Sequence, residues 1–140
     1  MVYEMKLNSK PFGMIRSGRK TVELRLFDEK RRKLNPGDHI IFTNLSAENE
    51  RIAVKIKALY RYGSFRELFS EISPVICGND PGTSAGEAAS GMRAFYSEEQ
   101  EELYGVLGIK LEVVDLEPVF LQRELEYAAY IDRLFPDGMK

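Results

Sequence analysis

Residues 18–26 constrain the fold of this chain more than any other stretch. They follow a short helical pattern that ends at Gly18, and their side chains then alternate with the period of a β-strand. One face of the expected strand is apolar and suits a hydrophobic core, whereas the other face is polar or charged. The apolar face consists of Val22, Leu24 and Leu26, and the polar face consists of Thr21, Glu23 and Arg25.

The polar face, together with Lys20, is the candidate functional site. Two fixed cations and one carboxylate within six residues suit an anionic or amide-bearing ligand such as a nucleotide. Two other interpretations remain open. One is a solvated strand face, for which charges of both signs are ordinary, and the other is a structural ion-pair network that bridges strands.

The size and charge of the chain narrow the class of protein. Its 140 residues suffice for one domain with a sizeable core. The net charge of −2 argues against a protein that coats nucleic acid, but the charge is unevenly distributed. Residues 1–33 contain ten Lys or Arg and four Asp or Glu, whereas residues 34–140 contain ten and eighteen. This asymmetry points to an anionic partner.

The sequence also limits the compartment and the cofactors that we expect. No apolar run approaches the length of a membrane span, and a charge interrupts the N-terminal residues before an apolar region develops. The single cysteine, Cys77, permits no internal disulfide and no structural zinc set. We therefore expect a cytoplasmic protein with no membrane partner, no metal and no cofactor.

Further strand patterns occur on both sides of the polar face along the chain. Expected strands cover residues 2–7, 20–26, 39–43, 51–61 and 106–114, and the last is apolar enough to be buried on both faces. A charge run precedes the turn signal at residues 35–38. This run is either a solvated turn or helix, or a phosphate-steering edge formed by Lys30, Arg31, Arg32 and Lys33.

Helix signals separate these strands. Ser9 is expected to cap a helix that runs through Ser17, and capping-box patterns at residues 64–67 and 97–100 begin two more helices. Residues 73–91 are irregular, with a weakly helical stretch at 85–89, and we expect a mobile connection that acts as a lid beside a cleft.

The C-terminal segment has a helical period. Its repeating positions are Phe120, Glu124, Tyr127, Ile131 and Leu134. We expect an amphipathic helical extension over residues 116–140 that packs on the same domain. A contact with a second copy of the chain, or with another partner, is the alternative.

Little in the sequence indicates a familiar catalytic centre. There is no phosphate-binding loop and no dinucleotide fingerprint. His39 is the only histidine, and we expect it to be structural or on the surface. We expect Cys77 to be a small buried hydrophobic residue rather than a reactive thiol.

The order of the motifs resembles the ASCH domain, a PUA-related family, over about residues 3–114. The resemblance rests on Pro11-Phe12 with Ile15, Gly18-x-Lys20-x-x-Glu23-x-Arg25, Pro36-Gly37-Asp38-x-Ile40-x-Phe42, and Tyr96-Ser97-x-Glu99 through Tyr104-Gly105-Val106-Leu107-Gly108-Ile109. It implies an α+β fold, with a PUA-like mixed β-barrel of about five to six strands and surrounding helices over residues 1–115. Residues 116–140 would then be an extra C-terminal helix.

The resemblance also implies a cleft that binds RNA, a nucleotide or a nucleoside. In this cleft Lys20 would hold phosphate or act as a base, Glu23 would accept hydrogen bonds from a base edge or orient Lys20, and Arg25 would bind phosphate or anchor Glu23. Further candidate ligand contacts are Arg19, Thr21 and Tyr96. Candidates for a surface on which a base stacks are Tyr3, Tyr60, Tyr62, Phe95 and Tyr96.

Two enzymatic alternatives remain open. Some proteins of this family are amidohydrolases that act on an acetylated cytidine and use a threonine nucleophile where this chain has Glu23. A carboxylate does not follow the same acyl-enzyme route with comparable ease, although Thr21 offers a neighbouring hydroxyl. Ribonuclease chemistry, with Lys20 and Glu23 as base and acid, is the other.

The sequence therefore predicts an RNA- or nucleotide-binding domain. The alternatives are a hydrolase that acts on a modified nucleoside or RNA, and a regulatory protein-interaction module, with a homodimer through the C-terminal helix as one form of it.

Overall fold

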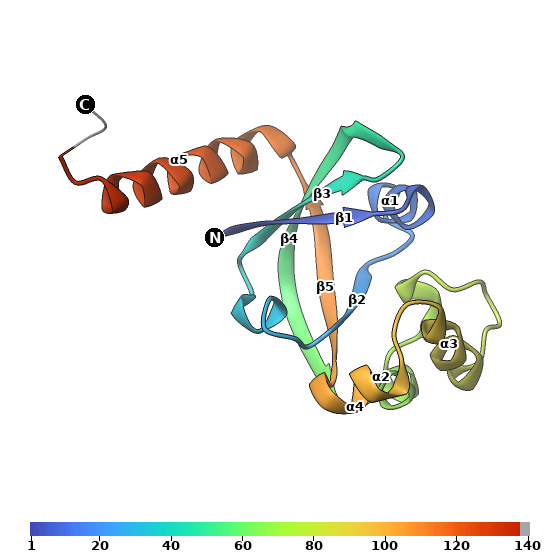
Figure 1. The fold of residues 1–140 in the computed structure, drawn as a ribbon. Coiled ribbons are helices and arrows are strands. Elements are labelled where there is room, and N and C mark those ends of the chain that lie inside the picture. The colour runs from blue at the N-terminus through green and yellow to red at the C-terminus, as the bar shows by residue number, and fades with distance from the viewer. Residues whose placement is uncertain (138–140) are drawn as a thin grey trace.

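A curled, mixed five-stranded sheet organises the molecule. The computed structural model describes residues 1–137. The strand order is β1-β3-β4-β5-β2, in which β1 is parallel to β3 and all other neighbours are antiparallel. The bounds are β1 (Val2–Leu7), β2 (Val22–Leu26), β3 (His39–Asn44), β4 (Ala47–Tyr62) and β5 (Val106–Val114). β1 and β2 are thus the two edges of the sheet, which curls into a half-barrel (Figure 1).

Helices lie at both ends of this half-barrel. Three short helices gather where β4 ends and β5 begins, whereas the long C-terminal helix leaves from the opposite end of β5 (Figure 1). The helices are α1 (Ser9–Arg16), α2 (Phe65–Glu71), α3 (Ala85–Gly91), α4 (Glu98–Tyr104) and α5 (Leu116–Leu134). Single 3₁₀ turns occur at η1 (Arg31–Lys33), η2 (Pro74–Cys77) and η3 (Met92–Ala94). The predicted α+β fold with a PUA-like barrel is confirmed, as a half-barrel of five strands.

The element ends differ from the prediction in a few places. α1 begins at Ser9, so Asn8 rather than Ser9 occupies the N-cap position. β4 begins at Ala47 rather than at residue 51. The segment 73–91 is more regular than predicted, because η2 and α3 lie within it and a capping box between Ser84 and Glu87 begins α3. Only residues 106–109 of β5 are buried on both faces of the sheet. In the second half of the strand, residues 110, 112 and 113 are exposed to solvent.

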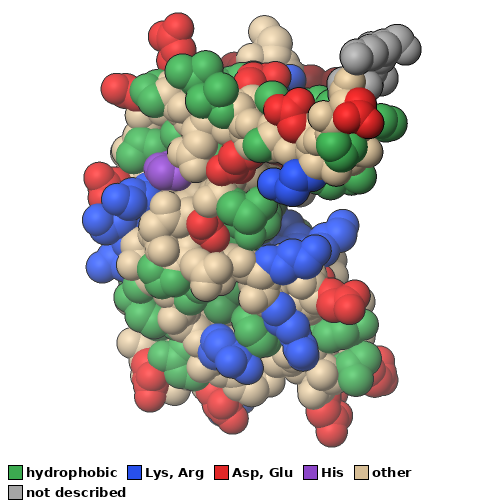
Figure 2. Space-filling model, turned by 90° about the vertical axis from the view of Figure 1, so that its left-hand side faces the viewer, with side chains coloured by type: hydrophobic (Ala, Val, Ile, Leu, Met, Phe, Trp, Pro, Cys, Tyr) green, Lys and Arg blue, Asp and Glu red, His purple; other side chains and the backbone are tan. Residues whose placement is uncertain are grey.

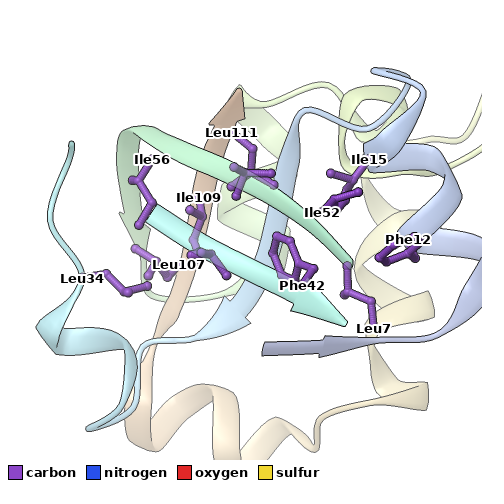
Figure 3. Packing of buried hydrophobic residues seen from close by; sticks show 12 residues of the cluster. Leu7, Phe12, Ile15, Leu34, Phe42, Ile52, Ile56, Leu107, Ile109 and Leu111 are labelled. Carbon is purple, nitrogen blue, oxygen red and sulfur yellow. The ribbon is translucent and has the colours of Figure 1, made fainter. Parts of the chain in front are cut away.

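The main core lies between α1 and the concave side of the sheet (Figure 3). Phe12 and Ile15 of α1 belong to the same buried cluster as Phe42 of β3 and Ile109 of β5, and all four side chains are almost fully buried. A second cluster covers the apolar face of β2. Its members include Val22, Leu24, Leu26, Phe65, Leu68, Phe69, Cys77, Ala88 and Val106. The predicted burial of the apolar face of residues 22–26 and of Cys77 is therefore confirmed.

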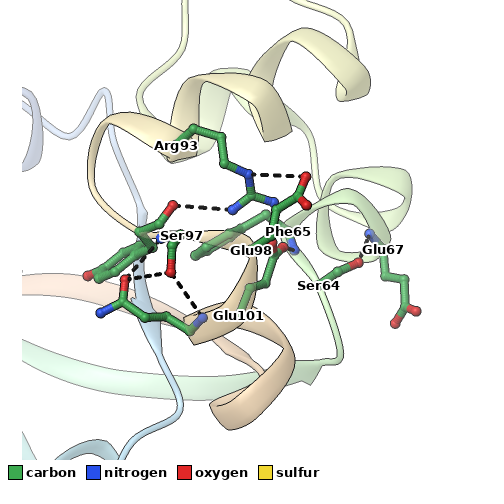
Figure 4. Close-up of polar contacts among 9 residues, drawn as sticks. Ser64, Phe65, Glu67, Arg93, Ser97, Glu98 and Glu101 are labelled. Carbon is green, nitrogen blue, oxygen red and sulfur yellow. Dashed lines mark hydrogen bonds and ion pairs between the residues drawn. The ribbon is translucent and has the colours of Figure 1, made fainter.

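A buried carboxylate joins α2, η3 and α4. Glu101 of α4 accepts a hydrogen bond from the backbone N–H of Phe65, at the beginning of α2, and forms an ion pair with Arg93 of η3 (Figure 4). The carboxylate of Glu101 is stabilised beside the beginning of α2, because the first N–H groups of a helix carry partial positive charge. Glu101 thereby fixes the segment that leads from α3 to α4.

The C-terminal helix contacts the sheet through residues between Leu116 and Glu126. Val119 is buried against Ile41 and Ala53, and the carboxylate of Glu126 accepts a hydrogen bond from the backbone N–H of Val2 at 2.9 Å. Exposed apolar side chains on or directly after α5 are Leu121, Leu125, Tyr127, Tyr130, Leu134 and Phe135. The domain boundary near residue 115 and the homodimer stay predictions, and residues 138–140 lie outside the described part. None of the described helices combines the length and hydrophobicity that a membrane crossing requires.

The Glu101 contacts give a first testable prediction. Glu101→Ala removes the acceptor of the Phe65 N–H and the partner of Arg93, and we expect the free energy of unfolding to fall by about 2–3 kcal/mol. Urea denaturation measures this change. Glu102→Ala, at an exposed position of the same helix, is the control and should change stability by less than about 0.5 kcal/mol. Equal stability of the two variants would contradict the role given to Glu101.

Candidate functional site

The candidate site lies at the open side of the half-barrel, where β1 and β2 face each other as unpaired edges. A cavity of about 400 Å³, called the first cavity below, opens there. Its wall combines the polar side chains of β2 with residues of β1, α1, η2 and the segment from α3 to α4. These segments are distant in the sequence, and the sheet order brings them together.

Glu23 is the central residue of the site. Its Oε1 accepts a hydrogen bond from Lys20 Nζ at 2.7 Å, and its Oε2 accepts one from Arg25 Nε at 2.9 Å. The backbone N–H of Leu24 also donates to Oε1 at 3.3 Å. Only 3% of Glu23 is exposed, so both carboxylate oxygens are engaged within the protein. This burial excludes the interpretation of the polar face as a solvated strand face.

The backbone around Lys20 is held by two neighbouring segments. The N–H of Lys20 donates to the carbonyl of Met14 in α1, and the N–H of Thr21 donates to the carbonyl of Ile76 in η2. Gly78 lies against the Lys20 side chain with φ of +102°. The backbone conformation favours glycine here, and a Cβ atom at that position would lie 3.2 Å from Lys20 Cδ, so the Lys20 side chain would have to shift slightly.

Arg25 connects the two edges of the sheet. Its Nε binds Glu23, and its Nη2 donates to the backbone carbonyl of Lys6 in β1 at 3.2 Å. A planar guanidinium with several donors is suited to such a bridge, because it satisfies two acceptors without bending. Arg25 therefore crosses the seam that the barrel leaves open.

The charges of this cluster fix its protonation. Burial alone would raise the pKa of Glu23, but the ammonium of Lys20 and the guanidinium of Arg25, with the hydrogen bonds they donate, hold the pKa below its ordinary value. Glu23 is consequently an anion at neutral pH. The three side chains together carry one net positive charge, which suits an anionic ligand.

Aromatic side chains also line the first cavity. Phe95 and Tyr96 both line it, and Phe95 remains 66% exposed. The ring of Tyr96 stacks on that of Phe65, with centroids 5.9 Å apart. Of the other aromatic residues predicted for stacking, Tyr60 and Tyr62 line neither cavity described here, and Tyr3 lines the second one introduced below.

Two of the other predicted ligand contacts, Arg19 and Thr21, do not line the first cavity. Arg19 is exposed, pairs with Asp80 at 3.8 Å and does not line the first cavity. Thr21 is half-buried, and its side chain is also outside the lining. Cys77 does line the cavity, but burial raises the pKa of its thiol to about 12, so the thiol is protonated at neutral pH and is a poor nucleophile.

Several residues of the cavity were missed by the sequence analysis. Lys6, Asn8 and Lys10 come from β1 and the beginning of α1, and Asn79 follows η2. An exposed lysine carries no local signal of a site. The one available signal was the excess of cations in residues 1–33, which does not identify individual side chains.

The basic segment lines a second cavity beside the first. This second cavity also has a volume of about 400 Å³, and Lys30, Arg31 and Lys33 contribute to its wall. Arg32 does not, because its guanidinium lies over the ring of Phe27, 5.4 Å from the centroid. The face shown in Figure 2 carries a group of Lys and Arg side chains beside a hollow. Within residues 1–137, no three His, Cys, Asp or Glu side chains gather as a metal site would require.

The Glu23 cluster predicts a specific pH dependence of stability. Because the folded pKa of Glu23 is lowered, its contribution is present above the ordinary Glu pKa of about 4.3 and is lost as the pH falls through the lower folded value. Glu23→Gln lacks this contribution. We expect the variant to be less stable than the wild type by about 3 kcal/mol at pH 7, and the gap to narrow in acid.

Urea denaturation between pH 3 and pH 7 measures this gap. Glu48→Gln, at an exposed position of β4, is the control and should follow the wild type at every pH. A gap for Glu23→Gln that is constant with pH would show that the carboxylate is not stabilised by its two cations.

Comparisons with known proteins agree with this architecture. The family model described as "ASCH domain" matches residues 5–115. A crystal structure of the hypothetical protein PH0355 is 37% identical, with a TM-score of 0.71, and covers 81% of this chain and 100% of its own. A solution NMR structure of protein PF0455 from Pyrococcus furiosus is 35% identical, with a TM-score of 0.60, and covers 82% and 99%. A search of curated proteins gave no match. The chain therefore belongs to the ASCH domain family.

Proposed function

We propose that this chain binds RNA or a nucleotide in the first cavity. One observation carries the proposal: a fixed pair of cations and an exposed aromatic side chain line the same cavity. Phosphate and a base are the two parts of a nucleotide that such walls recognise. The family's association with RNA agrees with this proposal, although neither relative's name states a ligand.

Phosphate would bind on the side of Lys6, Lys10 and Lys20. The charges of Lys20 and Arg25 are partly neutralised by Glu23. These two side chains would therefore orient the phosphate, whereas most of the attracting charge would come from other residues. Lys6 and Lys10 are exposed, and the structure records no ion pair for either among residues 1–137. Their charges are therefore available to a ligand.

A base would stack on the aromatic residues of the lining. Phe95 presents its ring to solvent at the cavity, and Tyr96 is held in place by its stacking on Phe65. Stacking of one base on an aromatic side chain contributes about 1–3 kcal/mol and tolerates different bases. Asn79, also in the lining, offers an amide for hydrogen bonds to a base edge.

The geometry supports binding over hydrolysis. Glu23 has a lowered pKa, so it is anionic at neutral pH and has no proton to give as a general acid. The candidate nucleophiles are equally unsuited, because Thr21 lies outside the lining and the thiol of Cys77 is protonated.

Removal of the two free lysines tests the proposal. For Lys6→Ala/Lys10→Ala we expect weaker binding of a mixed RNA pool and of nucleoside monophosphates. The slope of log affinity against log salt should become shallower by about 0.7 for each lost phosphate contact. Fluorescence anisotropy at several salt concentrations measures both quantities. The fold should persist, since both side chains are exposed.

The matched control is Lys57→Ala/Lys110→Ala, which removes the same charge from exposed positions outside both cavities. If both double variants lose the same affinity, the loss follows from net charge alone, and the proposed binding site is wrong. Mass spectrometry of the incubated RNA and nucleosides covers the enzymatic alternative: product that disappears in a folded Lys20→Ala variant would make the protein a hydrolase.

A pair of glycine variants tests the position of Lys20 independently. Gly78→Ala and Gly82→Ala both force alanine into a positive φ, at a cost of about 1–2 kcal/mol. Only the former places a methyl group against Lys20, since nothing lies within 4 Å of the Cβ position at Gly82. We expect similar losses of stability but weaker ligand binding only for Gly78→Ala. Equal ligand binding by both variants would show that Lys20 does not contact the ligand.

A further inference from the structure

The first and second cavities share part of their wall. Lys6 and Arg25 line both of them. Arg25 donates to the backbone carbonyl of Lys6, so the guanidinium is fixed where the two cavities meet. The two cavities, each of about 400 Å³, therefore lie on either side of one guanidinium.

The second cavity carries positive charge that the protein does not use. Lys30 and Lys33 line it, and within residues 1–137 the structure records no ion pair for either. The cation of Arg31 is compensated by Asp28 at 2.9 Å. Glu4 is the one carboxylate in the lining, and it pairs with Arg123 at 2.6 Å. Lys30 and Lys33, together with the Lys6 that both cavities share, therefore remain for an anionic ligand.

The second cavity also has an apolar part. Tyr3, Met5 and Leu34 contribute to its wall, and the Tyr3 hydroxyl donates to the backbone carbonyl of Lys33 at 3.1 Å, which fixes the ring. A site for phosphates alone has no use for such a wall. An aromatic ring beside cations is instead the arrangement that a second base and its phosphate require.

We propose that the two cavities together bind a single-stranded oligonucleotide of at least two nucleotides. One nucleotide occupies the first cavity, Arg25 and Lys6 contact the phosphodiester between the two, and the second nucleotide lies among Tyr3, Lys30 and Lys33. This inference rests on the proposed function, and it adds the length of the ligand and the place of its second unit. It predicts that the preferred ligand is neither a free mononucleotide nor a nucleoside triphosphate.

Competition binding tests the inference. The probe is a fluorescein-labelled RNA tetramer of random sequence, and the competitors are mixed nucleoside monophosphates, mixed nucleoside triphosphates and mixed dinucleotides. We expect dinucleotides to compete about tenfold better than monophosphates, and better than triphosphates, because they add a stacked base and a phosphate contact. Deoxydinucleotides that compete equally well would support an oligonucleotide of either sugar.

The variant Lys30→Ala/Lys33→Ala locates the second unit. In this variant the inhibition constants of dinucleotides should come to within about twofold of those of monophosphates. The inhibition constants of the monophosphates should not change, because only the second nucleotide loses contacts. Lys57→Ala/Lys110→Ala is again the matched control and should retain the preference for dinucleotides.

The outcomes separate the inference from the function on which it rests. If monophosphates bind and dinucleotides bind no better, or if triphosphates equal dinucleotides, the second unit is overturned and the proposed function stands. The second unit is likewise overturned if Lys30→Ala/Lys33→Ala weakens the binding of monophosphates and dinucleotides equally. If neither the tetramer nor any nucleotide binds the wild type, both proposals are wrong.

Discussion

The buried carboxylate of Glu23 is the interaction on which the rest of the site depends. A carboxylate that is 3% exposed is costly unless hydrogen bonds and opposite charges replace its water. Lys20 and Arg25 supply both, each on its own oxygen. The same contacts hold the two cations in fixed directions. Arg25 then reaches β1, so one anion determines how the open side of the half-barrel is bridged.

The bridge explains why binding chemistry concentrates at this seam. A closed barrel would pair β1 with β2 through the backbone, whereas here the two edges leave room for side chains and cavities. The Glu101 contacts fix the α3–α4 segment, which contributes Phe95 and Tyr96 to the lining of the first cavity. Charged and aromatic side chains from different parts of the chain thus line one cavity.

Local sequence patterns predicted the elements of the fold better than the site. Alternation identified β2 and its apolar face, but it also assigned Glu23 to a face exposed to ligand or solvent. Periodicity cannot predict that two neighbouring cations make burial of a carboxylate favourable. Lys6 joins the site only through the sheet order, in which β1 is the edge opposite β2. The lysine itself carries no such signal.

Side-chain NMR of the Arg25 guanidinium tests the central claim most directly. In ¹H–¹⁵N spectra, titration with the RNA tetramer should shift the Arg25 Nε–H resonance, assigned through its loss in Arg25→Lys. The resonance should stay visible throughout, because Glu23 keeps its hydrogen bond. Binding of RNA that shifts resonances elsewhere and leaves the Arg25 signal unchanged would contradict the proposed site, since the ligand would then lie away from the seam.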